Sequence, residues 1–534
     1  MTLSTTTSAA LWRGAELLAP LAGTASLEVY DLRTTSPEVR LSISSLTGLL
    51  NRYSAKIYCL ENNDDDFWLR QLATDVPCTR SPLSGEAALE HLLRTHREQV
   101  AGLVMYDPDL LDTRNVATTL AGVRSGLVVA PEQAKKLQGA PYHLPVLADL
   151  RAYGWRNRLQ AYTWAAEHVL PECSPDLLAG LDPRLCGGLR SLLVTRSVFT
   201  CWLDTRQRLP APAAIWPGER ALFKRILAHF HPGALHLGWF IDEPSGIRLT
   251  SQAALLTLAS DHCTNLAVWS TLHALPPTPP ASEGEGADMM ATPPEVAREP
   301  LDRRTTYLSF TISDGDNLQY CQHHLLHLWN NPARGSLPLG WTIAPALWQI
   351  MPRLADFYRR TASAQDELIA GPSGAAYMLP SHWPSEHQEA FLQLTGRTLQ
   401  TMSPALLQVL DSRSWLSRFS MRFLNPTLQT RFAAQLAPHG LRGILSGAGG
   451  FFPSWKLRAG LPIYQNLGLA LNAQRALSLI RSAMRRGVRF INIYIFAWNI
   501  SPADLQRVVE QLDGNVRVVT PMRLLELIQE AERP

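Results

Sequence analysis

Short apolar segments alternate with longer stretches of helical period through the first half of the chain. Apolar residues three or four positions apart predict amphipathic helices, and compact apolar runs between them predict strands. The predicted strands are 26–32, 55–60, 102–107, 126–130, 235–241 and 265–270. Helices are predicted at 37–53, 66–74 and near 114–121, and the stretch from about 154 to 230 has mostly helical periodicity. Such alternation is typical of parallel α/β layers.

The same alternation returns in the last part of the chain. Six apolar runs of β type, separated by helical patterns, lie at 305–313, 341–347, 367–373, 443–447, 489–496 and 516–520. Two late helices have clear starts, because Ser501 and Thr520 are each followed by proline, and Asp504 can reach back to the cap. Strands and helices in this order suit a barrel or a doubly wound sheet, and we predict a (β/α) barrel-like domain.

A stretch rich in proline and glutamate separates the two halves. PPTPPASEGEGADMMATPPEVAREP, at 276–300, cannot bury enough apolar surface to fold alone. The predicted order is a tail at 1–25, an α/β region at 26–153 with room for two subdomains, and a helical and α/β subdomain at 154–275. A linker at 276–302 then leads to a C-terminal domain at 303–534, which we expect to hold the active site.

Composition identifies a globular protein and gives no indication of a nucleic-acid partner. The 534 residues exceed one ordinary core, and 46% of them are hydrophobic and 18% charged. A net charge of +3 is close to neutral for this length. Seven scattered cysteines without a C-x-x-C pair indicate reduced thiols rather than a disulfide framework or a zinc site.

The N-terminal segment argues for a cytoplasmic protein. MTLSTTTSAALWRGAELLAPLAG lacks a basic start, and Arg13 and Glu16 interrupt its apolar part, so it is a poor secretory signal. No apolar run is long enough to span a bilayer. We expect a soluble protein without a membrane partner, and the sequence does not indicate its oligomeric state.

The strand predicted at 305–313 ends in two aspartates within FTISDGDN. Leu308, Phe310 and Ile312 share one face by period two, and continued extension would put Asp314 and Asp316 on that same side. The carboxyl end of a strand is where α/β folds place their sites, and a helix N-terminus stabilises negative charge. A capped turn is the alternative explanation, although capping needs only one such residue.

A second stretch, GPSGAAYMLP at 371–380, follows a short apolar run. Small residues there let backbone amides approach a ligand, and Ser373 or Tyr377 could hydrogen-bond to it. Taken alone, such a segment is more often a turn. It matches neither a nucleophile elbow nor a phosphate-binding loop.

The two stretches together resemble one family. The chain is similar to the GxGYxYP family of putative glycoside hydrolases, whose C-terminal domain has SDGDN at a strand end, then RG-x-x-P-x-G-W and D-x-(apolar)-x-x-GPSG-x-GY-x-YP. The corresponding segments here are 313–317, 334–341 and 366–380. RNVATTL at 114–120 and GWFIDE at 238–243 resemble the family's N-terminal domains, so the resemblance extends from about residue 26 to 528. It implies the family's fold and a carbohydrate or glycoside as the substrate.

Two positions depart from the motif that names the family. Ala376 replaces its second glycine and adds a methyl group, and Leu379 replaces its second tyrosine and removes a hydroxyl. If these atoms contact substrate, specificity or activity is changed. Gly374 stands at the first glycine of the motif and, with Ser373 and Tyr377, is a candidate for substrate binding.

Glycoside hydrolysis needs one protonated and one ionised carboxyl. The C-terminal candidates are Asp314, Asp316, Asp366 and Glu367, and the first two are close enough in sequence to perturb each other. The preferred pair is Asp314 or Asp316 with Asp366, because Asp366 falls in a segment that the resemblance matches. Asn317 is a further candidate for substrate binding.

Two acidic residues and two tryptophans extend the candidate site. Asp242 and Glu243, at the end of the strand predicted at 235–241, could complete the pocket or form a structural turn before proline. Trp341 and Trp498 have flat apolar faces that suit sugar rings, although burial in a barrel is the commoner explanation for tryptophan.

Two other functions stay open. A strand that ends in Asp-Gly is also similar to the metal-binding segment of polysaccharide deacetylases, and His323 and His327 would share one face of the predicted helix and could hold a divalent metal. Otherwise no cofactor is expected. The changed name-giving motif favours the third possibility, a non-catalytic carbohydrate-binding or scaffold protein.

Overall fold

The computed structural model describes residues 17–18, 21–206, 218–273, 300–412, 421–448, 453–512 and 514–533. Contacts divide the chain into two compact units, an N-terminal unit of residues 1–272 with 349–351 and 382–390, and a C-terminal unit of the remaining residues. Most of the predicted tail at 1–25 and nearly all of the predicted linker at 276–302 lie outside the described residues. Within the described parts of the chain, no helix is both long and apolar enough to cross a membrane.

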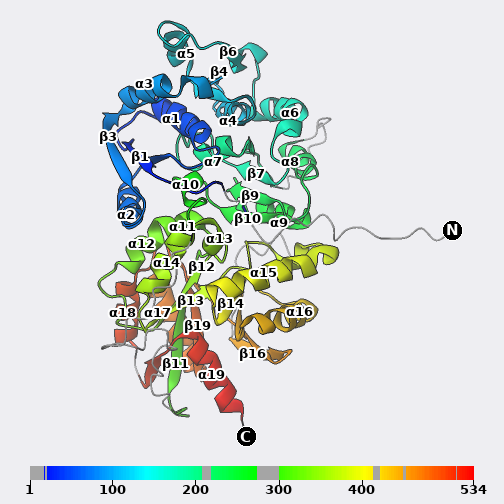
Figure 1. The fold of residues 1–534 in the computed structure, drawn as a ribbon. Coiled ribbons are helices and arrows are strands. Elements are labelled where there is room, and N and C mark those ends of the chain that lie inside the picture. The colour runs from blue at the N-terminus through cyan, green and yellow to red at the C-terminus, as the bar shows by residue number, and fades with distance from the viewer. Residues whose placement is uncertain are drawn as a thin grey trace, which may run out of the picture. The chain divides into compact units, whose positions relative to one another are not determined.

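In its described residues, the N-terminal unit contains three parallel sheets, each accompanied by helices (Figure 1). Their strand orders are β2-β1-β3, β5-β4-β6 and β10-β9-β7-β8. The strands are β1 (Leu27–Asp31), β2 (Ile57–Leu60), β3 (Cys78–Ser84), β4 (Gly102–Met105), β5 (Gly126–Val129), β6 (Val146–Asp149), β7 (Leu177–Gly180), β8 (Phe199–Cys201), β9 (Leu235–Gly238) and β10 (Leu256–Ala259). The helices are α1 (Pro37–Leu50), α2 (Asn63–Leu72), α3 (Gly85–Thr95), α4 (Thr113–Arg124), α5 (Pro131–Gln138), α6 (Arg158–His168), α7 (Arg190–Thr195), α8 (Glu219–Leu227), α9 (Glu243–Gln252) and α10 (Leu266–Trp269).

Two sequence-based predictions in this unit are wrong. The segment 265–270 is not a strand but contains the short helix α10, and all four residues of α10 are buried. An apolar run buried on every side has no amphipathic period, so its pattern does not separate a strand from a helix. The stretch 154–230 is not mostly helical either, because it contains the fully buried strands β7 and β8. Strands of three or four buried residues are too short to show alternation.

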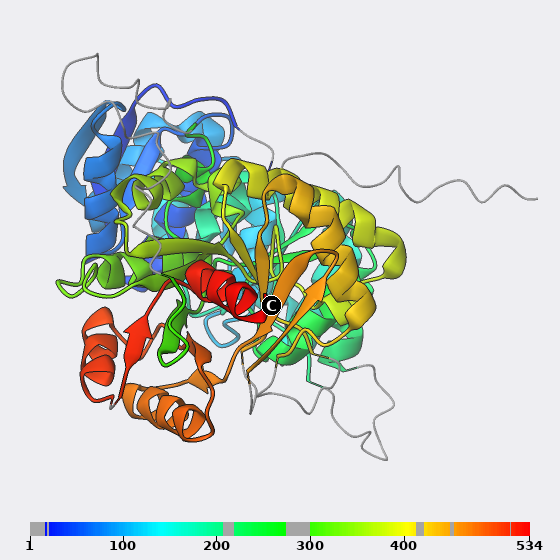
Figure 2. The same ribbon diagram turned by 90° about the horizontal axis from the view of Figure 1, so that it is seen from below.

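The C-terminal unit is built on one ten-stranded sheet that curls into a half-barrel (Figure 2). The order is β16-β17-β15-β14-β13-β12-β11-β19-β18, with β20 beside β11. Among these described strands, β16 and β17 pair antiparallel and the other pairs are parallel. The strands are β11 (Thr306–Ile312), β12 (Leu339–Ile343), β13 (Asp366–Ala370), β14 (Leu406–Val409), β15 (Gly443–Ser446), β16 (Ser454–Arg458), β17 (Leu461–Gln465), β18 (Leu469–Ala470), β19 (Phe490–Ile495) and β20 (Val516–Val518). The helices are α11 (Leu318–Gln322), α12 (His324–Trp329), α13 (Leu347–Ile350), α14 (Pro352–Thr361), α15 (Gln388–Met402), α16 (Pro426–Leu436), α17 (Ala473–Arg485), α18 (Pro502–Glu510) and α19 (Pro521–Glu532).

This architecture confirms the predicted fold class, N-terminal α/β domains followed by a barrel-like domain. The predicted helix starts are also confirmed. Ser501 accepts a hydrogen bond from the backbone N–H of Asp504, whose carboxylate accepts from Ser501 in return, and Thr520 caps α19.

The last helix fills the curve of the sheet at the amino ends of the strands. Leu524, Leu525 and Ile528 of α19 pack in one buried cluster with Tyr307 and Leu406, which stand near the starts of their strands. Figure 2 shows α19 lying inside the arc of strands. Burial of these apolar groups is the main stabilising contribution at this end of the sheet. The candidate site lies at the opposite end.

Candidate active site

The SDGDN loop is pinned against the neighbouring strand. The N–H of Gly315 donates to Thr342 Oγ1 at 3.0 Å, and the same hydroxyl donates to the carbonyl of Ile312 at 2.6 Å. A Cβ on Gly315 would lie 2.4 Å from the backbone nitrogen of Ile343, so only glycine allows this approach. Asp314 adopts a left-handed backbone conformation with φ of 72°. The strand therefore stops abruptly and presents the loop at the carboxyl edge of the sheet.

The inner face of β11 is polar, and the loop continues from it. Ser309 Oγ and Thr311 Oγ1 donate to Asn492 Oδ1 of β19 at 2.8 and 3.1 Å. Leu308, Phe310 and Ile312 face the opposite side by alternation. The left-handed conformation of Asp314 ends that alternation, so the expectation that Asp314 continues the apolar face is wrong.

Asp314 lies in an environment that favours its protonated form. Burial is the largest influence and raises the pKa of Asp314, although hydrogen bonds from the Ser313 hydroxyl, the Trp498 indole and the Ala497 N–H oppose it. The nearby His324 ring also lowers this pKa, to a smaller extent. A carboxyl that keeps its proton to higher pH than an exposed aspartate can act as a general acid.

Tyrosine and amide groups that the sequence analysis missed surround the two aspartates. Burial raises the pKa of Tyr494 well above its usual value, and the charges of Asp314 and Asp316 raise it further. Tyr494 donates to Gln408 Oε1 of β14 at 2.9 Å. Within the described part of the chain, Gln408 Nε2 and the hydroxyl of Tyr320 are buried without a hydrogen-bond partner. Buried polar groups are normally paired, so these two donors call for a further partner, such as a water molecule or a ligand.

The one sign of these groups in the sequence was the pattern of RFINIYIF at 489–496. Asn492 and Tyr494 alternate with apolar residues there, which gives β19 one polar face. Gln408 could not be found this way, because β14 is a four-residue buried strand that the sequence did not predict.

Trp498 lies beside Asp314 and is 42% exposed. Its indole stacks on His324 with 4.6 Å between ring centroids, and the His324 Nε2–H donates to the carbonyl of Ala497 at 2.9 Å. The imidazole therefore holds the indole in place while leaving part of it open to solvent. A fixed and partly exposed indole next to a carboxyl suits stacking on a sugar ring.

Asp366 lies at the other end of the sheet. It is the first residue of β13 and pairs in register with Leu339 at the start of β12, whereas Ile312 pairs with Trp341 further along. This places Asp366 on the order of 10 Å before the SDGDN loop along the strand direction. The structure does not bring Asp366 together with Asp314 and Asp316.

The oxygens of Asp366 are occupied by structural partners. They accept from Arg334 Nη1 at 2.6 Å, from Trp341 Nε1 at 2.9 Å, and from the N–H and hydroxyl of Ser363 at 2.9 and 2.7 Å. The Asp366 side chain has no exposed surface. Trp341 is fully buried and packs edge-on against Trp329, so its ring is not available to a sugar.

The GPSG segment forms a buried connection after β13. The N–H of Ser373 donates to the carbonyl of Gln408 at 2.7 Å, and its hydroxyl donates to the carbonyl of Leu410 at 3.0 Å. Gly374 has φ of 136°, and a Cβ there would lie 2.5 Å from Thr395 Oγ1. The hydroxyl of Tyr377 points at Met421 Sδ, 3.7 Å away. These contacts fix the backbone beside Gln408.

The two departures from the name-giving motif are also buried. Ala376 is 3% exposed and Leu379 is 2% exposed. A methyl group and an isobutyl group at these positions therefore pack inside the protein rather than at its surface.

Three other candidates have local structural contacts. Asn317 caps α11 and accepts from the N–H of Tyr320 at 2.9 Å. Asp242 and Glu243 belong to the N-terminal unit, where Asp242 caps α9 by accepting from the N–H and hydroxyl of Ser245 at 3.2 and 2.7 Å.

The two histidines offered as metal ligands do not lie on one continuous helix. The helix breaks at His323, which separates α11 from α12, so the expectation that His323 and His327 share a helical face is wrong. The Tyr358 hydroxyl donates to the carbonyl of Cys321 at 2.6 Å and so satisfies a carbonyl that the broken helix leaves open. Among the described residues, no group of three or more His, Cys, Asp and Glu side chains could hold a metal ion.

Four domain profiles of one family match the chain in succession. They are described as the GxGYxYP_N first domain at 26–92, the GxGYxYP_N second domain at 100–174, the GxGYxYP third domain at 175–271 and the GxGYxYP putative glycoside hydrolase C-terminal domain at 304–529. The chain belongs to the GxGYxYP family. Its SDGDN loop, Tyr494 and Trp498 all lie within the C-terminal GxGYxYP domain.

One solved structure is similar in fold to this GxGYxYP chain over nearly its whole length. A putative hydrolase from Bacteroides thetaiotaomicron is 20% identical, with 98% of each chain covered and a TM-score of 0.79. A putative polysaccharide deacetylase from Mycobacterium smegmatis is 12% identical over 44% of this chain and 93% of its own, at a TM-score of only 0.32, which does not establish a common fold. No curated protein matches this member of the GxGYxYP family.

Proposed function

We propose that the protein is a glycoside hydrolase whose active site is the carboxyl edge of β11 and β19, with Asp314 as the general acid. The observation that carries the proposal is the raised pKa of Asp314, which burial causes, next to the partly exposed indole of Trp498. A carboxyl whose pKa is raised can act as the general acid of glycosidic bond cleavage, and an aromatic ring beside it can stack on the sugar. The family description and the name of the similar structure agree with hydrolysis of a glycoside.

Asp314 supplies the proton in this mechanism. Its carboxyl protonates the glycosidic oxygen as the bond from that oxygen to the anomeric carbon breaks, and the leaving group departs as an alcohol. Asp316 is the second carboxylate. It acts on the anomeric carbon directly or on the attacking water, and the net reaction adds one water across the bond. Proton NMR of the first-formed anomer distinguishes the two routes.

The neighbouring groups position the substrate. Tyr320 and Gln408 have buried donor atoms without partners among the described residues, and sugar hydroxyls would accept from them. Trp498 stacks on one sugar ring, and the hydrogen bond from the Tyr494 hydroxyl to Gln408 Oε1 at 2.9 Å holds both of these side chains in place.

Substitution of the two aspartates tests the proposal. Asp314→Asn and Asp316→Asn should each abolish turnover on a panel of aryl glycosides, while the unfolding transition stays where it is in the unmodified protein. Glu510→Gln serves as the matched control, because Glu510 is exposed on α18 of the same unit. Full activity in both aspartate variants, or loss of stability with activity intact, would refute the catalytic assignment.

The same exposed indole also suits a protein that binds carbohydrate without cleaving it. Glycan-array binding by the unmodified protein, with no turnover of any bound glycan, would identify that function. Elemental analysis of protein purified without chelator addresses the metal-dependent alternative. One equivalent of a divalent metal that is lost in His323→Ala or His327→Ala would favour it.

A further inference from the structure

The N-terminal unit contains a cavity of about 350 Å³ where four parallel strands end. The loops that follow β1, β2, β7 and β10 contribute its walls, although these strands belong to two different sheets. The residues that carry the argument are Arg40, Glu61, Asn62, Gly187, Gly188 and Asp261. Cavities of this volume at the carboxyl ends of parallel strands are the usual place for a ligand in α/β folds.

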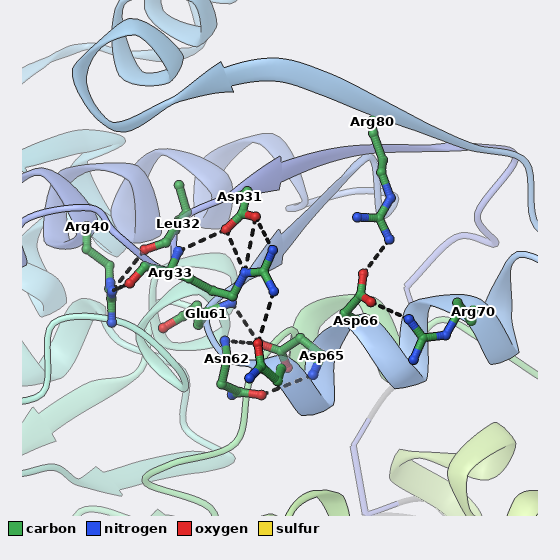
Figure 3. Close-up of polar contacts among 11 residues, drawn as sticks. Asp31, Leu32, Arg33, Arg40, Glu61, Asn62, Asp65, Asp66, Arg70 and Arg80 are labelled. Carbon is green, nitrogen blue, oxygen red and sulfur yellow. Dashed lines mark hydrogen bonds and ion pairs between the residues drawn. The ribbon is translucent and has the colours of Figure 1, made fainter.

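Hydrogen bonds hold these loops in place. Asp65, at the start of α2, accepts from the N–H groups of Glu61 and Asn62 at 2.7 and 3.1 Å, and from the hydroxyl of Thr264. Arg40 Nη2 donates to the carbonyl of Leu32 at 2.8 Å, as Figure 3 shows. The cavity is therefore preformed, and a ligand would not have to order its walls.

A glycine brings the loop after β7 directly against the wall formed by β2. The N–H of Gly188 donates to both carboxylate oxygens of Glu61 at 2.9 Å. A Cβ on Gly187 would lie 1.8 Å from Glu61 Oε2 and 3.1 Å from Arg40 Cδ. Any side chain at Gly187 would therefore push Glu61 and Arg40 out of position.

Two polar atoms of cavity residues lack a hydrogen bond. Asp261 Oδ1 and Arg40 Nε are buried, and neither has a partner within the described ranges. Buried polar groups in folded proteins are normally paired, so an unpaired acceptor and an unpaired donor in two residues that line one cavity call for a further partner. A hydroxyl group can donate to the first and accept from the second.

Charge selects the class of ligand. Arg40 and Glu61 line the cavity with opposite charges, and the other two charged lining groups already have ion-pair partners, Arg184 in Asp182 and Asp261 Oδ2 in His262 at 3.7 Å. Neither sign of charge therefore dominates the cavity. Phosphate or another anion would meet two carboxylates, and an ammonium group would meet two guanidinium groups. We propose that this cavity binds a neutral polyhydroxylated molecule, a monosaccharide or short oligosaccharide, whose hydroxyls pair with Asp261 and Arg40. The proposal does not rest on catalysis at Asp314.

Saturation-transfer NMR on the full chain tests this site. The probes are D-glucose, D-galactose, D-mannose and D-xylose, with inorganic phosphate as the charged comparison. Asp261→Asn should weaken binding of the preferred sugar about tenfold or more, because an amide replaces a charged acceptor. Gly187→Ala should abolish it. Gly218→Ala is the matched control, since a Cβ there meets no atom within 4 Å.

The double variant Asp314→Asn with Trp498→Ala separates this cavity from the candidate active site. We expect it to keep the binding that Asp261→Asn loses, whatever its effect on turnover. Three results would overturn the proposal: no probe sugar binds, binding survives Asp261→Asn unchanged, or the double variant alone removes it. Tighter binding of phosphate than of every sugar would also overturn it, in favour of an anion site.

Discussion

The two edges of the C-terminal sheet place their carboxyl groups in contrasting surroundings. At the carboxyl edge, Asp314 stands in a loop with a left-handed backbone, and burial raises its pKa. At the amino edge, Asp366 is enclosed and accepts four hydrogen bonds. The sequence treats the two aspartates alike, since both fall in segments shared with the same family. They differ in their position along the strands. Asp314 follows the end of its strand and is a candidate for catalysis, whereas Asp366 begins its strand and forms a structural ion pair with Arg334.

Glu367, the next residue of β13, shows that a raised pKa alone does not mark an active site. Burial raises the pKa of Glu367 to about 7, and its Oε2 accepts from the N–H of Met522 at the start of α19 at 2.9 Å. Glu367 stands near the amino end of β13, against the start of α19, and not in a loop at the carboxyl edge. The proposal is supported by the raised pKa of Asp314 together with the partly exposed indole of Trp498, and not by a raised pKa alone.

The largest expected effect is on turnover at the carboxyl edge. Asp314→Asn should lower kcat by about 10²- to 10⁴-fold, because the general acid is lost. Its free energy of unfolding should fall by no more than about 1 kcal/mol in urea unfolding, because asparagine keeps the size of the side chain and tolerates a left-handed backbone. If Asp314→Asn keeps more than half of the activity, the carboxyl edge of the sheet does not supply the general acid, and the proposed difference between the two edges is wrong.

The second effect is on stability at the amino edge. Asp366→Asn should lower the free energy of unfolding by about 3 kcal/mol, because it leaves Arg334 facing a neutral partner in a mostly buried site. The protein that remains folded should retain its kcat. Loss of kcat without loss of stability would instead return Asp366 to the catalytic pair.

A pH series sharpens the comparison further. The folded pKa of Glu367 is about 7 and its unperturbed value is 4.5. Between these values the unfolded chain releases a proton that the folded protein keeps, so this group's contribution to stability is complete below pH 4.5 and is lost as the pH rises through 7. The loss should approach about 1.4 kcal/mol per pH unit inside this window. Glu367→Gln should flatten the profile, and identical slopes in the two proteins would contradict the assignment.

The smallest expected effect concerns the aromatic platform. Trp498→Ala should raise KM by about three- to tenfold while kcat changes less, because stacking contributes about 0.5–1.5 kcal/mol to binding. Steady-state kinetics on one aryl glycoside measures this split. Trp341→Phe is the companion variant, since Trp341 is buried at the amino half of the sheet and should alter stability but not KM.

Several elements were predictable because their determinants are local. The strand that ends in SDGDN, the caps at Ser501 and Thr520, and the half-barrel class follow from short-range patterns and from the resemblance to the family. The helix break at His323 was not predictable, since the partner of the Cys321 carbonyl beside it is the hydroxyl of Tyr358 in α14, which is distant in sequence. The strand β14 was missed because four buried residues show no period.

The sequence by itself determined the alternation of strands and helices, the place of Asp314 and Asp316 at a strand end, and the family to which both belong. Only the tertiary structure decided which end of the sheet each motif occupies, and so separated Asp314 from Asp366. It also brought Gln408, Asn492 and Tyr494 together beneath the loop. The physical reason is that hydrogen bonds between strands and the burial of carboxyl groups depend on sheet order and register, which residues distant in sequence establish together.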